Sequence, residues 1–217
     1  MKKRKLYLLC AIVLILSFIV SGCKKNSQAT THPSNYQQLA GLIGKTMSDV
    51  CKELNVKKDK LDNPAIGLYL LPDKIEYCGH SFEILLNFDV TSDEETLYGF
   101  WYRTIFTDDM GKAATFIDEL AEKFTSKYDA WDLYSVSNRI TEQNNLVELL
   151  DKDDIVTTSE VFDLSKEVTD NMKEYMSNYK EKNAKSLEYG MVLLANSTEN
   201  SQVILTLKYE MKVNPNK

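Results

Sequence analysis

Two spacings of apolar residues run along the chain and predict different elements. Apolar side chains recur every three or four residues over 37–55, 111–128 and 166–185, and this spacing predicts amphipathic helices. A further short helix is predicted at 146–150. Elsewhere apolar and polar residues alternate, which predicts strands. The predicted strands span 82–88, 97–106, 156–162, 187–196 and 202–212.

Local signals indicate where several of these elements begin or end. Gly44 is expected to divide the first helical stretch in two. Thr46 is a good N-cap for the second part, because its hydroxyl can accept a backbone N–H. Ser165 is expected to cap the last helix in the same way. Residues 77–82 contain a glycine between strand-forming residues and predict a hairpin.

The order of these elements favours one fold class. Strands come in hairpin-like runs and not singly between helices, which argues for an antiparallel α+β domain rather than a doubly wound fold. We expect a sheet of about five to six strands with helices packed on it. Residues 97–106 are apolar on both faces, so this strand is expected to be central or covered on both sides. No linker rich in proline or glycine divides 36–217, which predicts a single domain.

The first 22 residues differ in chemistry from the rest of the chain. Residues 2–5 are all basic, and an apolar run of 15 residues follows from Leu6 to Val20. A membrane-spanning helix needs roughly 20 apolar residues, so this run is short for a permanent anchor and is typical of a secretory signal peptide. The run ends in Val20-Ser21-Gly22-Cys23, which resembles the lipobox of bacterial lipoproteins.

The resemblance to bacterial lipoproteins implies how the chain is processed. It implies that residues 1–22 are a signal peptide and that Cys23 is diacylated on sulfur and becomes the first residue after cleavage. The polar stretch that follows has no apolar periodicity, so 23–35 is expected to be the lipidated cysteine and a flexible tether. His32 lies in this tether and is expected to be solvent-exposed and without function. Residues 36–217 are then the extracytoplasmic α+β domain.

The charge distribution restricts the partners. The formal net charge of −6 averages a basic signal segment and a remainder with a net charge of −10. An acidic domain argues against nucleic-acid binding, which requires clustered lysine and arginine. The remainder uses lysine far more often than arginine, which is typical of AT-rich genomes such as those of many Gram-positive bacteria. We therefore expect attachment to the outer face of the cytoplasmic membrane through the lipid on Cys23.

Three motifs resemble functional signatures but lack essential parts of them. Gly44-Lys45-Thr46 resembles the end of a phosphate-binding loop, but Leu39 stands where that loop needs glycine, so no nucleotide partner is predicted. Ser177 and Lys180 match the S-x-x-K spacing of penicillin-binding proteins, whose other motifs are absent. Acidic stretches beginning at Asp89 and Asp151 lack the glycine and final glutamate of an EF-hand. No metal site and no cofactor are predicted.

The cysteines allow two readings. Cys51 and Cys78 could form a disulfide in an extracytoplasmic compartment. Cys51 also lies on the apolar face of a predicted helix, where a free buried thiol is ordinary. Cys78 and His80 are near neighbours in sequence, but catalysis would require their side chains to meet, and residues in a turn or strand usually point apart.

Aromatic residues are the last candidates for a site. Tyr98, Phe100 and Tyr102 share one face of a predicted strand and could form an exposed binding stripe, although such alternation is more often part of a core. These observations favour a non-catalytic binding or interaction module whose partner is an unknown protein or small ligand. The alternative is an envelope hydrolase acting on cell-wall or peptide substrates, with a site assembled from distant residues.

Overall fold

The computed structural model describes residues 30–91, 94–107, 109–131, 139–143, 145–150, 156–198 and 202–214. The predicted signal peptide, Cys23 and the acidic stretch at 151–154 lie outside these residues. Thr31–Lys217 forms one compact unit.

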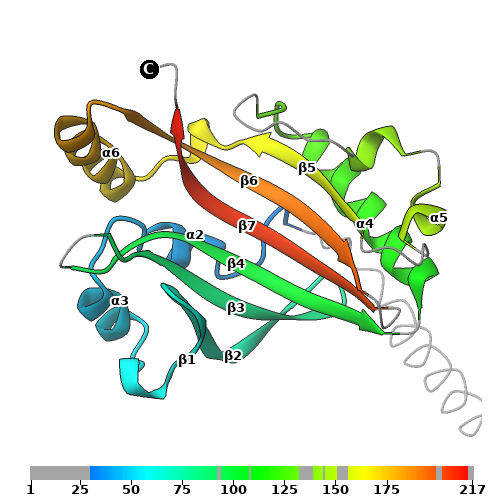
Figure 1. Cartoon of the computed structure of the whole chain (residues 1–217), viewed down its shortest axis with the longest axis horizontal. Coiled ribbons are helices and arrows are strands. Elements are labelled where there is room, and N and C mark those ends of the chain that lie inside the picture. The colour runs from blue at the N-terminus through cyan, green and yellow to red at the C-terminus, as the bar shows by residue number, and fades with distance from the viewer. Residues whose placement is uncertain are drawn as a thin grey trace, which may run out of the picture. The chain divides into compact units, whose positions relative to one another are not determined.

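The centre of this unit is a seven-stranded antiparallel sheet (Figure 1). Its strand order is β1-β2-β3-β4-β7-β6-β5. The first four strands form a meander, and β7 joins β4 to the β5–β6 pair. The strands are β1 (Asp62–Ala65), β2 (Leu68–Tyr77), β3 (His80–Asp89), β4 (Thr96–Thr107), β5 (Thr157–Asp163), β6 (Ser186–Ser197) and β7 (Gln202–Asn214).

The α+β class and the antiparallel sheet are confirmed, and β4 is the central strand, as its two apolar faces predicted. The predicted count of five to six strands was too low by at least one. Periodicity missed β2, of which only the end was indicated by the predicted hairpin, and it missed β1, whose four residues are all exposed and include Pro64. Such a strand buries no face, so it leaves no alternation in the sequence.

The helical elements are α2 (Tyr36–Ala40), α3 (Met47–Glu53), α4 (Met110–Thr125), α5 (Leu146–Leu150) and α6 (Asp170–Asn183), with 3₁₀ turns η1 (Lys58–Lys60), η2 (Ile140–Glu142) and η3 (Ser165–Glu167). Gly44 has a φ of 92° and separates α2 from α3, as predicted. Thr46 caps α3 by accepting from the N–H of Asp49. The expected cap at Ser165 was wrong, because α6 begins five residues later and its cap is Thr169.

Helices α2, α3 and α4 pack on one face of the sheet and cover its aromatic residues. Phe100 of β4 stacks on Tyr209 of β7, with ring centroids 5.1 Å apart. Tyr36 of α2 lies 5.0 Å from Tyr209, and Phe116 of α4 lies 6.3 Å from Phe82 of β3. Burial of such side chains stabilises the fold by about 1.5–3 kcal/mol each.

Of the two alternatives for Tyr98, Phe100 and Tyr102, the structure agrees with core packing for two residues and not with a shared exposed stripe. Phe100 and Tyr102 are fully buried in the core. Tyr102 also donates a hydrogen bond to Asn35 at 2.8 Å, just before α2. Tyr98 differs because it is the extra residue of a β-bulge opposite Asn87, and this bulge leaves it half-buried.

Of the two alternatives for the cysteines, the structure agrees with free thiols and not with a disulfide. Cys51 and Cys78 are free thiols. Cys51 is buried in α3, 3.6 Å from the sulfur of Met47. Cys78 is exposed in the turn between β2 and β3, and its sulfur accepts from Lys123 of α4 at 3.5 Å. Each thiol therefore packs against its own neighbours.

The opposite face of the sheet is more polar and carries one tight aromatic contact. Trp131 lies flat on Gly190 of β6, where an added Cβ would come within 2.3 Å of the indole ring. Glycine is required here by close approach and not by backbone conformation. On the same face, Glu83 accepts from Arg103 at 2.7 Å, and Lys208 lies 4.3 Å above the Trp101 ring.

Candidate functional site

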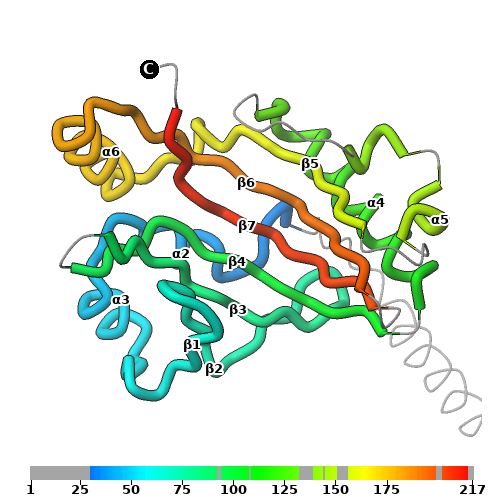
Figure 2. The backbone as a smooth tube through the Cα atoms, in the orientation of Figure 1, coloured from blue at the N-terminus to red at the C-terminus, as the bar shows by residue number. Residues whose placement is uncertain are grey.

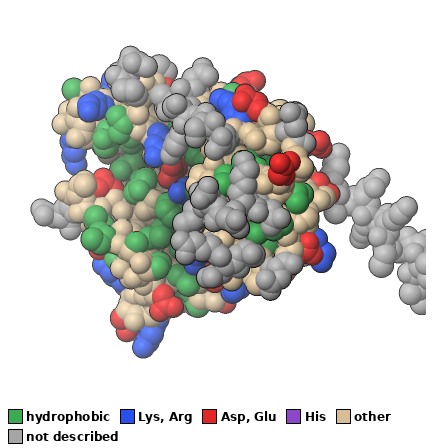
Figure 3. Space-filling model, turned by 45° about the vertical axis from the view of Figure 1, so that its right-hand side comes forward, with side chains coloured by type: hydrophobic (Ala, Val, Ile, Leu, Met, Phe, Trp, Pro, Cys, Tyr) green, Lys and Arg blue, Asp and Glu red, His purple; other side chains and the backbone are tan. Residues whose placement is uncertain are grey.

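A groove of about 790 Å³ lies between α6 and the adjacent ends of β3, β4 and β7. The hydrophobic side chains in Figure 3 gather along a hollow at the left of the view, on the side of the molecule where α6 lies. Residues that are distant in sequence meet in this groove, from Thr46 before α3 to Val213 at the end of β7. Its volume is in the range of small-molecule sites in proteins.

Three tyrosine side chains line the groove. Tyr175 and Tyr179 are one helical turn apart on α6, and their ring centroids lie 6.5 Å from each other. Tyr98 reaches the groove from the bulge in β4. The amide of Asn87, which is only 7% exposed, donates to the Tyr98 hydroxyl at 2.7 Å and holds it in place. All three rings are half-buried, so they are fixed by packing while still bordering the groove.

The position of α6 is fixed at its first turn. Thr169 caps the helix by accepting from the N–H of Met172, whose side chain is fully buried. Asn171 donates to the carbonyl of Gly41 at 2.6 Å. Gly44 lies so close that an added Cβ would be 3.0 Å from both the Asn171 carbonyl oxygen and Cβ of Tyr175. The glycine that ends the α2 segment therefore also lets α6 approach.

The groove contains both polar groups and exposed aliphatic side chains. Asp89 accepts from the N–H and hydroxyl of Thr91 at 2.9 and 2.7 Å, so its carboxylate is held in a local turn. Burial, with smaller contributions from Asp89, Tyr179 and Tyr98, raises the pKa of Tyr175 to about 12. The phenol is therefore neutral and can both donate and accept hydrogen bonds.

Exposed aliphatic residues border the same groove. Ile66 is 88% exposed, and Val90 and Val213 are about 40% exposed. Large aliphatic side chains in contact with water on a folded domain are a common feature of binding surfaces when they cluster. No local pattern predicts this cluster, since the three residues lie in different turns and strand ends.

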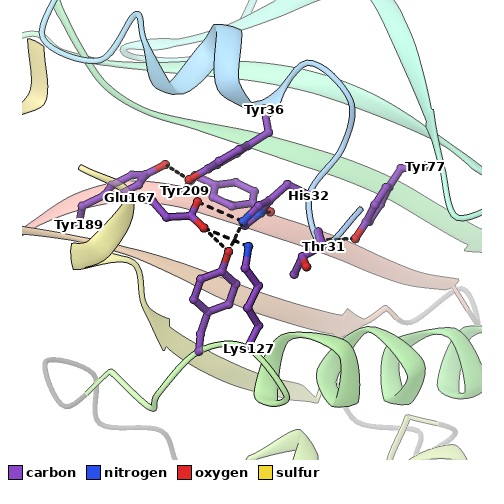
Figure 4. Close-up of polar contacts among 9 residues, drawn as sticks. Thr31, His32, Tyr36, Tyr77, Lys127, Glu167, Tyr189 and Tyr209 are labelled. Atoms are coloured by element: carbon purple, nitrogen blue, oxygen red, sulfur yellow. Dashed lines mark hydrogen bonds and ion pairs between the residues drawn. The ribbon is translucent and has the colours of Figure 1, made fainter. Parts of the chain in front are cut away.

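A second polar cluster lies inside the domain, around His32 (Figure 4). His32 is only 8% exposed, and its ring stacks on Tyr36 with centroids 3.9 Å apart. Its Nδ1 lies 2.9 Å from the hydroxyl of Tyr209, and its Nε2 lies 2.5 Å from the hydroxyl of Tyr128. The carboxylate of Glu167 is 3.2 Å from Nε2.

One arrangement of protons satisfies the bonds of this cluster with a neutral imidazole. Tyr128 donates to Glu167, so the Tyr128 oxygen is available to accept from His32 Nε2–H. Nδ1 of His32 then accepts from the Tyr209 hydroxyl. Burial lowers the pKa of His32 and outweighs the opposing effect of Glu167. In a protonated imidazole, Nδ1–H would instead donate to the Tyr209 oxygen, and the buried Tyr209 hydroxyl could no longer donate to Nδ1.

Glu167 is the charged member of this cluster. Burial tends to raise its pKa, but the polar groups of His32, Tyr128 and Tyr36 beside the carboxylate together hold the pKa well below its ordinary value. Lys127 donates to the same carboxylate at 3.2 Å and balances its charge. Neither the groove nor the smaller cavity beside β2 is lined by His32, Glu167 or Tyr128.

The expectation that His32 is exposed in a flexible tether was therefore wrong. The compact unit begins at Thr31, whose carbonyl accepts from Tyr77 at 2.5 Å. Residues 31–35 cross beneath β7 and are held there by the core (Figure 2). Their polar sequence concealed this role, because the segment is fixed by hydrogen bonds to tyrosines far away in sequence and not by apolar periodicity.

The side chains of the remaining candidate pair, Cys78 and His80, have separate partners in the structure. His80 packs its ring against Phe116 and Phe106, at 4.2 and 5.0 Å, while Cys78 contacts Lys123. Within the described residues, no group of three or more His, Cys, Asp or Glu side chains is arranged to hold a metal ion. No helix in the described part of the chain has the length and apolar character needed to cross a membrane.

Comparisons with protein-family models, with curated proteins and with solved structures found no match to this chain.

Proposed function

We propose that this protein is a lipid-anchored extracytoplasmic binding module whose ligand occupies the groove beside α6. The observation that carries the proposal is the groove itself, in which three fixed tyrosine rings and a buried amide adjoin exposed aliphatic side chains. A concave surface that combines apolar contacts with a few oriented polar groups is the usual form of a small-ligand site.

The proposed anchor is the lipid on Cys23, at the outer face of the cytoplasmic membrane. Its support is the lipobox Val20-Ser21-Gly22-Cys23 behind a basic start and a short apolar run. Each lipid methylene that enters the bilayer contributes about 0.8 kcal/mol, so two acyl chains hold a protein stably at a membrane. Replacing Cys23 by Ala is expected to abolish incorporation of labelled palmitate, and unchanged labelling would contradict the proposed anchor.

A hydrolase is the weaker proposal. The groove does include two acids, Asp89 and Glu94. The Asp89 carboxylate, however, is engaged by the N–H and hydroxyl of Thr91, which is the pattern of a turn. A general acid would instead need an environment that keeps its carboxyl protonated near neutral pH.

The binding function can be tested without knowing the ligand. Full-length protein in phosphatidylglycerol nanodiscs is incubated with an extract of cell envelope, washed and denatured, and the released small molecules are identified by mass spectrometry. The wild-type protein is compared with the double variant Tyr175→Ala/Tyr179→Ala and with Ile105→Ala, which changes an exposed residue of the opposite sheet face. We expect wild type and Ile105→Ala to release a species that the double variant does not, and equal recovery from all three would refute the proposal.

A further inference from the structure

The polar part of the groove is mostly uncharged. Among the described residues that line the groove, asparagine amides and threonine and tyrosine hydroxyls outnumber the charged side chains, which are Lys182, Asp89 and Glu94. These neutral groups can each donate and accept hydrogen bonds. Such a lining matches a ligand that carries many hydroxyl or amide groups and little net charge.

The aromatic residues have an arrangement that suits a chain of rings. Tyr175 and Tyr179 follow each other along the groove wall at the spacing of one helical turn, with ring planes inclined by 51°. Tyr98 lines the same groove from the sheet. The carbon-bound hydrogens of a sugar ring carry partial positive charge and pack against the electron-rich face of an aromatic ring. Successive sugar rings could therefore contact successive tyrosines.

Amide and aliphatic groups occur together at the groove. Asn178 and Asn183 lie on the α6 side, and Ile66, Val90 and Val213 are aliphatic side chains exposed among the lining residues. An acetamido group presents one amide and one methyl, and it would use both kinds of surface at once. Plain sugar hydroxyls would leave the aliphatic residues in contact with water.

We propose that the groove binds a neutral oligosaccharide that contains N-acetylated sugars, with Tyr175 and Tyr179 as the stacking residues. This inference rests on the proposed binding function and names the class of its ligand. A cationic ligand is the main competitor, since tyrosine rings also attract ammonium groups. Lys182 repels a cation and offsets one of the two acids, Asp89 and Glu94, that line the groove.

The test uses full-length protein in phosphatidylglycerol nanodiscs, which contain neither sugar nor choline. The probes are chitotetraose, which is a neutral oligomer of N-acetylglucosamine, cellotetraose, which lacks the acetamido groups, and choline. Binding is measured by isothermal titration calorimetry. We expect chitotetraose to bind with a dissociation constant below about 1 mM and more tightly than the other two.

Variants then place the ligand in the groove. An aromatic contact contributes about 0.5–1.5 kcal/mol, so Tyr179→Ala should weaken chitotetraose binding by about twofold to thirteenfold. Tyr179→Phe keeps the ring and should bind more tightly than Tyr179→Ala, and Ile105→Ala on the opposite face should bind as the wild type does. Thermal unfolding of each variant, followed by circular dichroism, verifies that the fold is retained.

The outcomes separate this inference from the proposed function. Binding of choline but not chitotetraose, with loss in Tyr179→Ala, would overturn the saccharide inference and leave the groove as a binding site. Equal binding of cellotetraose and chitotetraose would overturn the role of the acetamido group. Equal chitotetraose binding by wild type and Tyr179→Ala would overturn the placement in the groove. Failure of all probes, together with no groove-dependent species from the envelope extract, would overturn both proposals.

Discussion

Replacing His32 tests whether the segment before α2 is an integral part of the fold. His32→Ala removes the two ring nitrogens that contact Tyr209 and Tyr128, and it removes the ring that stacks on Tyr36. The two hydrogen bonds contribute about 1 kcal/mol each, and the stacked pair contributes about 0.5–1.5 kcal/mol. The buried cavity left by the ring adds to these losses. We expect the free energy of unfolding to fall by about 3–5 kcal/mol.

His32→Phe separates the contribution of the hydrogen bonds to the free energy of unfolding from the contribution of the ring. Phenylalanine keeps a ring of similar size against Tyr36 but offers no partner to Tyr209, Tyr128 or Glu167. We expect a loss of about 2–3 kcal/mol, because the stack is retained and buried polar groups lose their partner. The same substitution at the exposed His of a true tether would change stability by less than about 0.5 kcal/mol.

Urea unfolding measures both variants. Trp101 and Trp131 lie on the sheet and report loss of its packing through their fluorescence. Lys166→Ala is a suitable control, because its side chain is 89% exposed. A loss below about 1 kcal/mol in His32→Ala would refute the reasoning, since it would mean that residues 31–35 contribute little to the stability of the domain.

Three further predictions concern the titration of His32, the contact at Gly190 and the reactivity of the two thiols. Burial lowers the pKa of His32 below its ordinary 6.5, so the unfolded chain takes up this proton before the folded protein does. The free energy of unfolding should therefore decline as pH falls through 6.5. In urea unfolding, His32→Phe should show a shallower decline between pH 7 and 5. Gly190→Ala should lower the unfolding free energy by about 1–3 kcal/mol, because its Cβ would overlap Trp131, and an unchanged thermal midpoint would contradict that contact. Cys78 should react with a thiol reagent in the native protein and Cys51 only after unfolding, and a mass increase of about 2 Da on reduction would instead reveal a disulfide.

The sheet was predictable wherever a strand buries one face. Alternation in β3, β4 and β7 marks residues such as Phe82, Phe100 and Tyr209, and these are core residues in the structure. The short exposed β1 lacks such a pattern. The bulge that turns Tyr98 toward the groove depends on the register between β3 and β4, which no local spacing encodes.

The His32 cluster shows a different limit. Its members come from the segment before α2, from the turn after α4, from η3 and from β7. Histidine in a polar stretch rich in serine, threonine and asparagine resembles a linker by composition. Its burial depends on tyrosine hydroxyls supplied by elements 96 and 177 residues away, which composition cannot reveal.

The groove could not be predicted from the sequence for a third reason. It depends on how much of the apolar face of α6 the sheet covers, and not on which residues share that face. Periodicity assigned Tyr175 and Tyr179 to the apolar face of the last helix, and that assignment is correct, because both rings pack against the core cluster. Only Met172 on that face is fully buried, however, so the sheet covers the start of α6 and leaves the following turns half-covered. An apolar helix face becomes a core surface or a groove wall according to where the neighbouring strands end. Here β3 ends at Asp89 and β4 begins at Thr96, and these ends border the groove beneath the tyrosines. A sequence pattern defines which side chains share a face, but only the lengths and positions of the opposing strands decide how much of that face remains available to a ligand.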